Sequence, residues 1–97
     1  MNSIEIPSEV QRDSNAKELA RLWAANNKLN VAISVGIFAN NGKDEAACWG
    51  VVLSDFTRHV ARALCQQYGA NQEQIMAQIA DTYFKELGAP TSGIQGR

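Results

Sequence analysis

The clearest alternation of apolar and small or polar positions along this chain runs from Asn30 to Phe38. Successive side chains of an extended chain point to opposite sides, so a period of two is typical of a strand with one buried face. The sequence therefore predicts a β-strand over Asn30–Phe38, followed by a turn at Asn40-Asn41-Gly42. The β-branched side of this strand comprises Val31, Ile33, Val35 and Ile37, and the small side comprises Ala32, Ser34 and Gly36.

A pattern typical of a helix precedes the strand. Asn15 stands three residues before Glu18, which is the spacing of a capping box. The pair Asn26-Asn27 supplies residues that tolerate the left-handed conformation at a helix end. These signals predict a helix from Ala16 to Ala25, with apolar positions at Leu19, Leu22 and Trp23.

The stretch Asp44–Tyr68 supports two interpretations. Trp49–Leu53 could form a second short strand, with Ser54 capping a helix that starts at Asp55. Alternatively, Asp44 is the N-cap of one long helix, in which Gly50 costs about 1 kcal/mol but lets a neighbouring element approach closely. We favour the long helix, because a single apolar stripe at helical spacing crosses the whole stretch. This stripe comprises Trp49, Val52, Leu53, Phe56, Val60, Ala63 and Leu64.

A final helix follows at once. Gly69 is suited to end the long helix, Asn71 to cap the next one, and Gly88 with Pro90 to stop it. A connection this short makes the two helices neighbours, so the sequence predicts an αα-hairpin. The apolar positions of the last helix are Ile75, Met76, Ile79, Ala80, Tyr83 and Leu87.

These elements predict an α+β fold, with an N-terminal helix, one strong β-strand, a second short strand in the alternative interpretation, and a C-terminal αα-hairpin. Ninety-seven residues leave room for one domain, which we place at residues 1–90. Residues 91–97 are polar and glycine-rich and predict a flexible tail. The first dozen residues, with Ile-Pro-Ser at positions 6–8, predict an extended arm or a short edge strand.

Charge and hydropathy narrow the classes of function. The formal net charge is −1, so the chain lacks the excess of positive charge that is typical of a dedicated nucleic-acid binder. Residues 64–79 resemble a helix-turn-helix in spacing, but the segment that would read DNA carries no Lys or Arg before Lys85. No apolar run is long enough to span a membrane, and the N-terminus does not resemble a signal peptide. We therefore expect a cytoplasmic protein that binds neither membranes nor DNA.

The soft metal ligands are few. The candidate ligands are Cys48, Cys65 and His59. A zinc site needs three or four such ligands at suitable spacing, so the sequence predicts no metal site and no cofactor. On a single helix the two cysteines stand about 25 Å apart, which excludes a disulfide between them. We expect both to remain reduced thiols.

The side chains that could carry chemistry are Asp55, Arg58 and His59, with Arg62 one turn further on. In a catalytic interpretation, Asp55 orients His59 as a general base and an arginine holds an anionic substrate. In a structural interpretation, which we favour, they form an ion-pair ladder along the helix, with His59 half-buried. Trp23 and Trp49 could stack on a ligand, but both are expected in the core because they fall within apolar helical stripes.

Several of these segments together resemble a small bacterial family, the domain of unknown function 5076. The resemblance extends from Ile6 to Thr91 and depends on five segments: Glu-Leu-Ala-Arg-Leu-Trp at 18–23, Gly-Ile-Phe at 36–38, Ala-Cys-Trp-Gly at 47–50, Asp55, and Arg-His-Val-Ala-Arg-Ala at 58–63. Family members often carry Asp-Pro-Ala-Ala at positions 44–47, which supports a helix start there. The resemblance implies a bacterial cytoplasmic protein with one compact α+β domain, and it implies no catalytic residue.

The function predicted first is a small non-enzymatic interaction or accessory protein that self-associates. A strand over Asn30–Phe38 needs backbone partners that the chain itself hardly offers, so a homodimer paired through this strand is expected. If Trp49–Leu53 were a strand, it would instead complete the sheet within one chain. The alternatives are a small enzyme or ligand-binding protein using Asp55, Arg58 and His59, and a helix-turn-helix regulator, which the uncharged reading segment disfavours.

Overall fold

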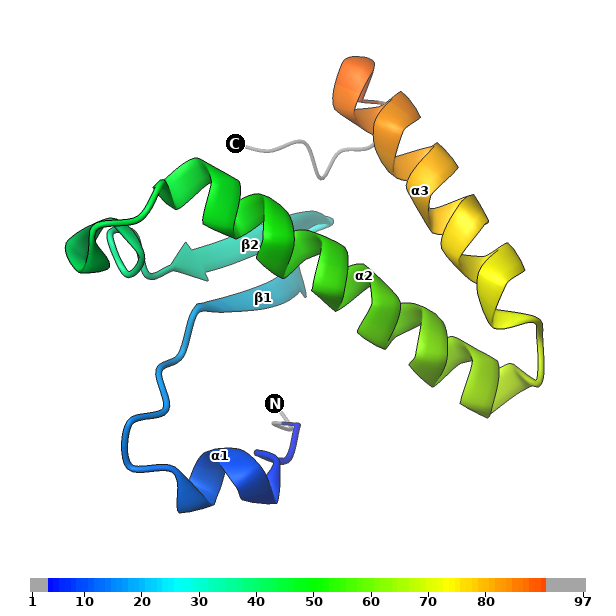
Figure 1. The fold of residues 1–97 in the computed structure, drawn as a ribbon. Coiled ribbons are helices and arrows are strands. Elements are labelled where there is room, and N and C mark those ends of the chain that lie inside the picture. The colour runs from blue at the N-terminus through cyan, green and yellow to red at the C-terminus, as the bar shows by residue number, and fades with distance from the viewer. Residues whose placement is uncertain (1–3, 91–97) are drawn as a thin grey trace.

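A computed structural model describes residues 4–90 of the chain. The elements follow in the order α1 (Ser8–Arg12), β1 (Ala20–Ala25), β2 (Lys28–Ile33), a short 3-10 helix η1 (Ala39–Asn41), α2 (Glu45–Tyr68) and α3 (Gln72–Gly88). The strands form one antiparallel hairpin and the two long helices form a second hairpin (Figure 1). The predicted α+β class is therefore confirmed. The predicted tail, residues 91–97, lies outside the described residues.

The N-terminal helix predicted over Ala16–Ala25 is wrong, because residues 16–19 belong to no helix and Ala20–Ala25 form strand β1. Asn26 and Asn27 both adopt the left-handed conformation, with φ of 55° and 61°. Two consecutive left-handed residues make the two-residue turn whose twist suits a β-hairpin, whereas a helix end needs only one. Asn15 caps no helix either, since its backbone N–H donates to the Asp13 side chain at 2.8 Å.

The predicted strand Asn30–Phe38 is right only in its first part. Strand β2 ends at Ile33, after which the Ser34 N–H still donates to the Leu19 carbonyl at 2.9 Å. Gly36 then takes a φ of 95° and turns the chain away from the sheet towards α2. The turn predicted around Gly42 is present as η1. The predicted N-terminal arm instead contains α1, and residues 4–7 belong to no strand.

Helix α2 is continuous from Glu45 to Tyr68, which confirms the long helix and excludes a strand at Trp49–Leu53. The Asp44 side chain caps it by accepting the Ala47 N–H at 3.2 Å. Gly69 ends it in the left-handed conformation, with φ of 73°, and donates its N–H to the Cys65 carbonyl at 2.8 Å.

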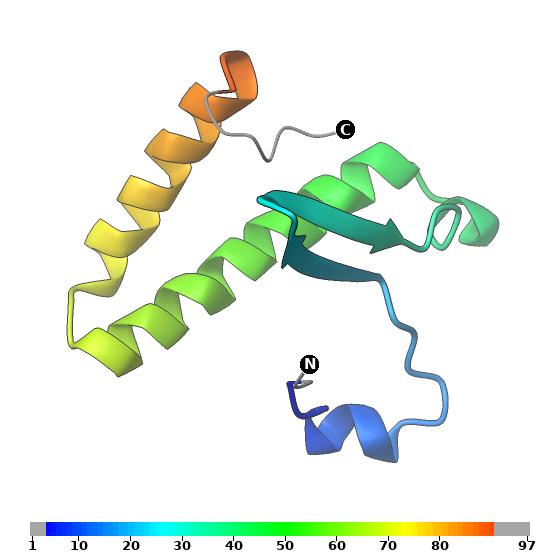
Figure 2. The same ribbon diagram turned by 180° about the vertical axis from the view of Figure 1, so that it is seen from behind.

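Helix α3 starts directly after this turn. The Asn71 side chain accepts the Gln74 N–H at 3.0 Å, so the predicted N-cap and the αα-hairpin are both confirmed. The two helices touch near their connection and diverge towards the start of α2 and the end of α3, so that the pair is V-shaped in both views (Figures 1 and 2).

The packing within one chain is open. Among residues 4–90, Ala61 is the only fully buried apolar residue. The chain exposes 8287 Å² to solvent, whereas a folded monomeric protein of 10.6 kDa exposes about 5,500 Å². Trp23 and Trp49 are half-buried rather than core residues, and Trp23 lies on a strand, not on a helix. No helix among the described residues is long and apolar enough to cross a membrane.

Candidate functional site

The predicted cluster of Asp55, Arg58 and His59 lies on an open surface of α2. One Asp55 oxygen is 3.6 Å from the Arg58 guanidinium, and the other is 3.6 Å from the His59 Nε2. All three side chains are more than half exposed, so the expectation of a half-buried His59 is wrong. The spacing of one helical turn brings them together as predicted. However, these distances exceed those of direct hydrogen bonds, and water screens the charges on both sides.

The two cysteines lie on the same helix, as expected from the sequence. Cys48 and Cys65 are both free thiols and both half-buried. Seventeen residues of helix separate them by about 25 Å, far beyond the reach of a disulfide within one chain. Within residues 4–90, no three His, Cys, Asp or Glu side chains gather closely enough to hold a metal ion.

The most highly organised polar contact is one that the sequence reasoning missed. The Glu45 carboxylate accepts four hydrogen bonds, and we call this arrangement the Glu45 junction. Three come from the backbone N–H groups of Gly36, Phe38 and Ala39, at 3.0, 2.9 and 2.8 Å. The fourth comes from Trp49 Nε1 at 2.9 Å. The spacing of four residues between Glu45 and Trp49 on a helix was the signal that could have revealed it.

Aromatic packing closes the Glu45 junction. The rings of Phe38 and Trp49 meet edge to face, with centroids 5.7 Å apart and planes at 86°. The hydrogen bond from Trp49 lowers the pKa of Glu45 most strongly, partial desolvation opposes this shift, and the backbone N–H groups of Ala39, Gly36 and Phe38 lower it further. Donors from the same chain therefore satisfy both oxygens of the Glu45 carboxylate. The carboxylate ties the segment that leaves β2 to the first turn of α2.

One side of the β-hairpin is wholly apolar. The pairing of Leu22 with Val31 and of Ala20 with Ile33 sets the register, so alternate residues of both strands share a face. Leu22 is 52% exposed, Val31 46% and Ile33 54%, so no element within residues 4–90 covers this side. We call it the apolar sheet face, and it comprises Ala20, Leu22, Ala24, Leu29, Val31 and Ile33.

The helices leave a second apolar surface uncovered. A groove of about 560 Å³ opens between the stretch of α2 from Gly50 to Arg58 and the stretch of α3 from Met76 to Phe84. We call it the helical mouth, and its apolar residues are Leu53, Phe56, Met76, Ile79, Tyr83 and Phe84. Phe84 is 69% exposed, and its ring packs edge to face on that of Tyr83 with centroids 5.4 Å apart.

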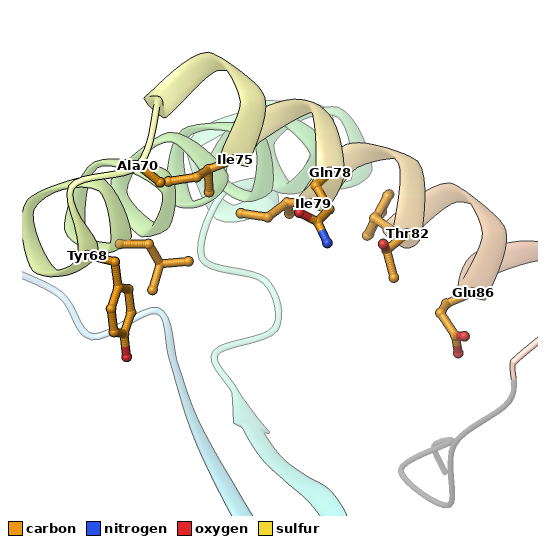
Figure 3. Close-up of a pocket in the computed structure, with 9 residues that line it drawn as sticks. Tyr68, Ala70, Ile75, Gln78, Ile79, Thr82 and Glu86 are labelled. Carbon is orange, nitrogen blue, oxygen red and sulfur yellow. The ribbon is translucent and has the colours of Figure 1, made fainter.

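A shallower groove of about 600 Å³ lies near the turn between the helices (Figure 3). Leu64 and Tyr68 line it from α2, and Ile75 and Ile79 from α3, while Gln78 and Thr82 add polar groups along α3. In this view Tyr68 stands at one end of the groove and Glu86 at the other. Apart from Glu86 its lining is uncharged, so the charge needed to bind DNA is not found on this side of α3.

Comparisons with known proteins place the chain in a family and a fold. The family model described as Domain of unknown function (DUF5076) matches residues 3–91. A solved structure from the photosynthetic bacterium Rhodopseudomonas palustrus CGA009, described as a "putative pyruvate dehydrogenase", has a similar fold, with a TM-score of 0.69 and 22% sequence identity. The match covers 100% of this chain and 94% of that one. No curated protein matches the chain. An identity of 22% shows a shared fold and no shared activity.

Proposed function

This chain belongs to the family described as Domain of unknown function (DUF5076), and we propose that it is a non-enzymatic accessory protein that acts as a homodimer. The observation that carries the proposal is the amount of apolar surface left uncovered. Sixteen large apolar side chains among residues 4–90 are more than a third exposed, while Ala61 alone is fully buried. A soluble monomer rarely exposes apolar patches of this extent, and patches that do occur mark binding surfaces.

The exposed area agrees with a dimer. Relative to a monomeric protein of its mass, the chain exposes an excess of about 2,800 Å². A protein–protein interface of standard size buries about 800 Å² on each partner, and obligate homodimers bury more. The area exposed by the whole chain therefore leaves enough surface for an interface of standard size between two copies.

The edge of β2 offers one route of association. The described sheet has two strands, so β2 has one edge with no strand beside it in residues 4–90. A two-stranded ribbon alone is marginally stable in water. Antiparallel pairing of β2 with its copy about a two-fold axis would give a four-stranded sheet, over a shorter segment than the sequence suggested. This pairing remains a proposal.

The geometry of the polar side chains favours a binding role over catalysis. The carboxylate of Asp55 lies 3.6 Å from both Arg58 and His59 on an exposed helix surface, where water screens the charges and the distances are too long for direct hydrogen bonds to orient an acid–base group. The dehydrogenase description belongs to the Rhodopseudomonas protein alone, and the likeness supports the fold. Free thiols at Cys48 and Cys65 support the proposed location in a bacterial cytoplasm.

Sedimentation equilibrium at micromolar concentration tests the proposal. We expect a single species of about twice 10.6 kDa. The double variant Asp55→Ala, His59→Ala serves as control and is expected to sediment as the wild type, because neither side chain belongs to the apolar surfaces. A wild-type species of 10.6 kDa at all concentrations would refute the homodimer.

A further inference from the structure

We infer that the apolar sheet face of one copy packs against the helical mouth of a second copy, and that the reciprocal contact forms about the same two-fold axis. This inference rests on the proposed self-association and specifies the surfaces that meet. Each dimer would then contain two equivalent sheet-on-helix contacts.

The apolar sheet face cannot be covered by pairing along the strand edge. Edge pairing extends a sheet in its own plane, so Leu22, Val31 and Ile33 would remain as exposed as they are in one chain. A sheet with one wholly apolar face needs a layer packed over it. The other face carries Arg21 and Lys28 together with the half-buried Trp23 and Asn30.

The chain's own α3 does not provide that layer. Helix α3 contacts α2, whereas the two strands contact chiefly each other; in both views the β-hairpin crosses α2, and α3 diverges from α2 beyond their connection (Figures 1 and 2). The Glu45 junction fixes the segment after β2 to the start of α2, which holds the sheet away from the end of α3. Phe84 and the rest of the helical mouth are therefore open to a second copy.

The reciprocal contact covers both surfaces at once. Packing the two sheet faces on each other would leave both helical mouths open, and packing the two mouths together would leave both sheet faces open. Sheet-on-helix packing covers each surface once per chain, and the sixteen exposed large apolar side chains of residues 4–90 include members of both surfaces.

The charges around these surfaces are compatible with burial. No residue of the apolar sheet face is charged, and its cross-strand pairs are apolar throughout. In the helical mouth the charged residue is Arg58, whose guanidinium lies 3.6 Å from Asp55 and is more than half exposed. Arg58 can therefore remain at the edge of the interface, where its ion pair with Asp55 stays hydrated.

A charge placed on each surface tests the inference. Val31→Glu puts a carboxylate on the apolar sheet face, and Ala32→Glu, the matched control, puts one on the opposite face beside Arg21. Burying an unpaired charge should raise the dimer dissociation constant roughly 100-fold or more for Val31→Glu, with little change for Ala32→Glu. Phe84→Glu should act like Val31→Glu, and Lys85→Glu, on the polar side of α3, should act as its control.

Cross-linking tests the pairing of the two surfaces while leaving the dimer intact. In a Cys48→Ser, Cys65→Ser background, chains carrying Val31→Cys are refolded together with tagged chains carrying Phe84→Cys and treated with a short bismaleimide. We expect a covalent heterodimer linked from position 31 to position 84. Chains carrying Ala32→Cys in place of Val31→Cys should cross-link far less.

The outcomes distinguish a failure of the homodimer from a failure of the sheet-on-helix contact. A wild-type protein that sediments as a monomer refutes the homodimer itself. A wild-type dimer that tolerates both Val31→Glu and Phe84→Glu, and that cross-links from position 32 as well as from position 31, refutes the sheet-on-helix contact and leaves the homodimer standing. Loss of association in both variants, with the selective cross-link, supports the contact.

Discussion

The Glu45 junction and the apolar sheet face lie on either side of the same short segment, yet they are completed in different ways. At the junction, four N–H donors meet one carboxylate at 2.8–3.0 Å, and every partner comes from the same chain. On the sheet face, Leu22 and Ile33 stay more than half exposed. Directional hydrogen bonds saturate with a few nearby groups, whereas apolar burial requires a second surface of comparable area.

This difference suggests a division of roles. The junction fixes the geometry of one chain, because it sets how the β-hairpin is attached to α2. In the proposed homodimer, the uncovered faces would supply the free energy of association, because they would be buried when two copies meet. Changes at the junction should therefore alter the stability of the fold, and changes on the faces should alter assembly.

The largest effect on stability is expected for Trp49→Ala. It removes the ring that packs on Phe38 and the N–H that binds Glu45, so the free energy of unfolding should fall by about 3 kcal/mol. Trp49→Phe keeps most of the ring contact and should cost about 1 kcal/mol. Urea unfolding at a fixed protein concentration measures both. Equal losses for the two variants would show that the ring packing contributes nothing.

The second expected effect depends on pH. Because the folded-state pKa of Glu45 is lowered, its contribution to stability is present above the unfolded pKa of about 4.3 and is lost as the pH falls through the folded pKa. Glu45→Gln should therefore lower the melting temperature at pH 7, and the difference from wild type should shrink below pH 4. Glu73→Gln, in the first turn of α3, is the control. A difference that persists at pH 2 would mean that the carboxylate charge is unimportant.

A third variant, Gly50→Ala, tests whether a second copy approaches α2. A Cβ added at Gly50 would meet no other part of the chain within 4 Å. The neighbouring element that the sequence predicted to pack closely at Gly50 is therefore not found among residues 4–90. Alanine should stabilise the helix by about 1 kcal/mol if this position stays free. Destabilisation, or a weakened dimer, would place the partner against Gly50. Gly69→Ala, at a left-handed φ of 73°, should destabilise in either case.

The smallest effect is expected for Asp55→Ala. Its pairs with Arg58 and His59 are exposed and 3.6 Å long, so the free energy of unfolding should change by about 0.5 kcal/mol or less. Thermal unfolding measures this change. A loss several times larger would show that these side chains are buried in the assembly, which would enlarge the interface beyond the helical mouth.

The sequence-based prediction succeeded where local signals agree with each other. Asp44, Gly69 and Asn71 mark the ends of α2 and α3 through hydrogen bonds to residues within four positions, so no distant partner is needed to recognise them. It failed at residues 16–25, where an apolar spacing of three fits a helix face. There, the two left-handed residues Asn26 and Asn27 carried the decisive signal for a hairpin.

By itself, then, the sequence determined the helical hairpin, its caps and the part of strand β2 from Asn30 to Ile33, because short-range hydrogen bonding and periodicity suffice for these. Only the tertiary structure decided that Glu45 reaches back to Gly36, Phe38 and Ala39, because those contacts depend on where β2 ends. It also decided which apolar residues remain exposed. Periodicity shows which side of an element is apolar, but only the placement of the elements in space shows whether anything in the same chain covers it.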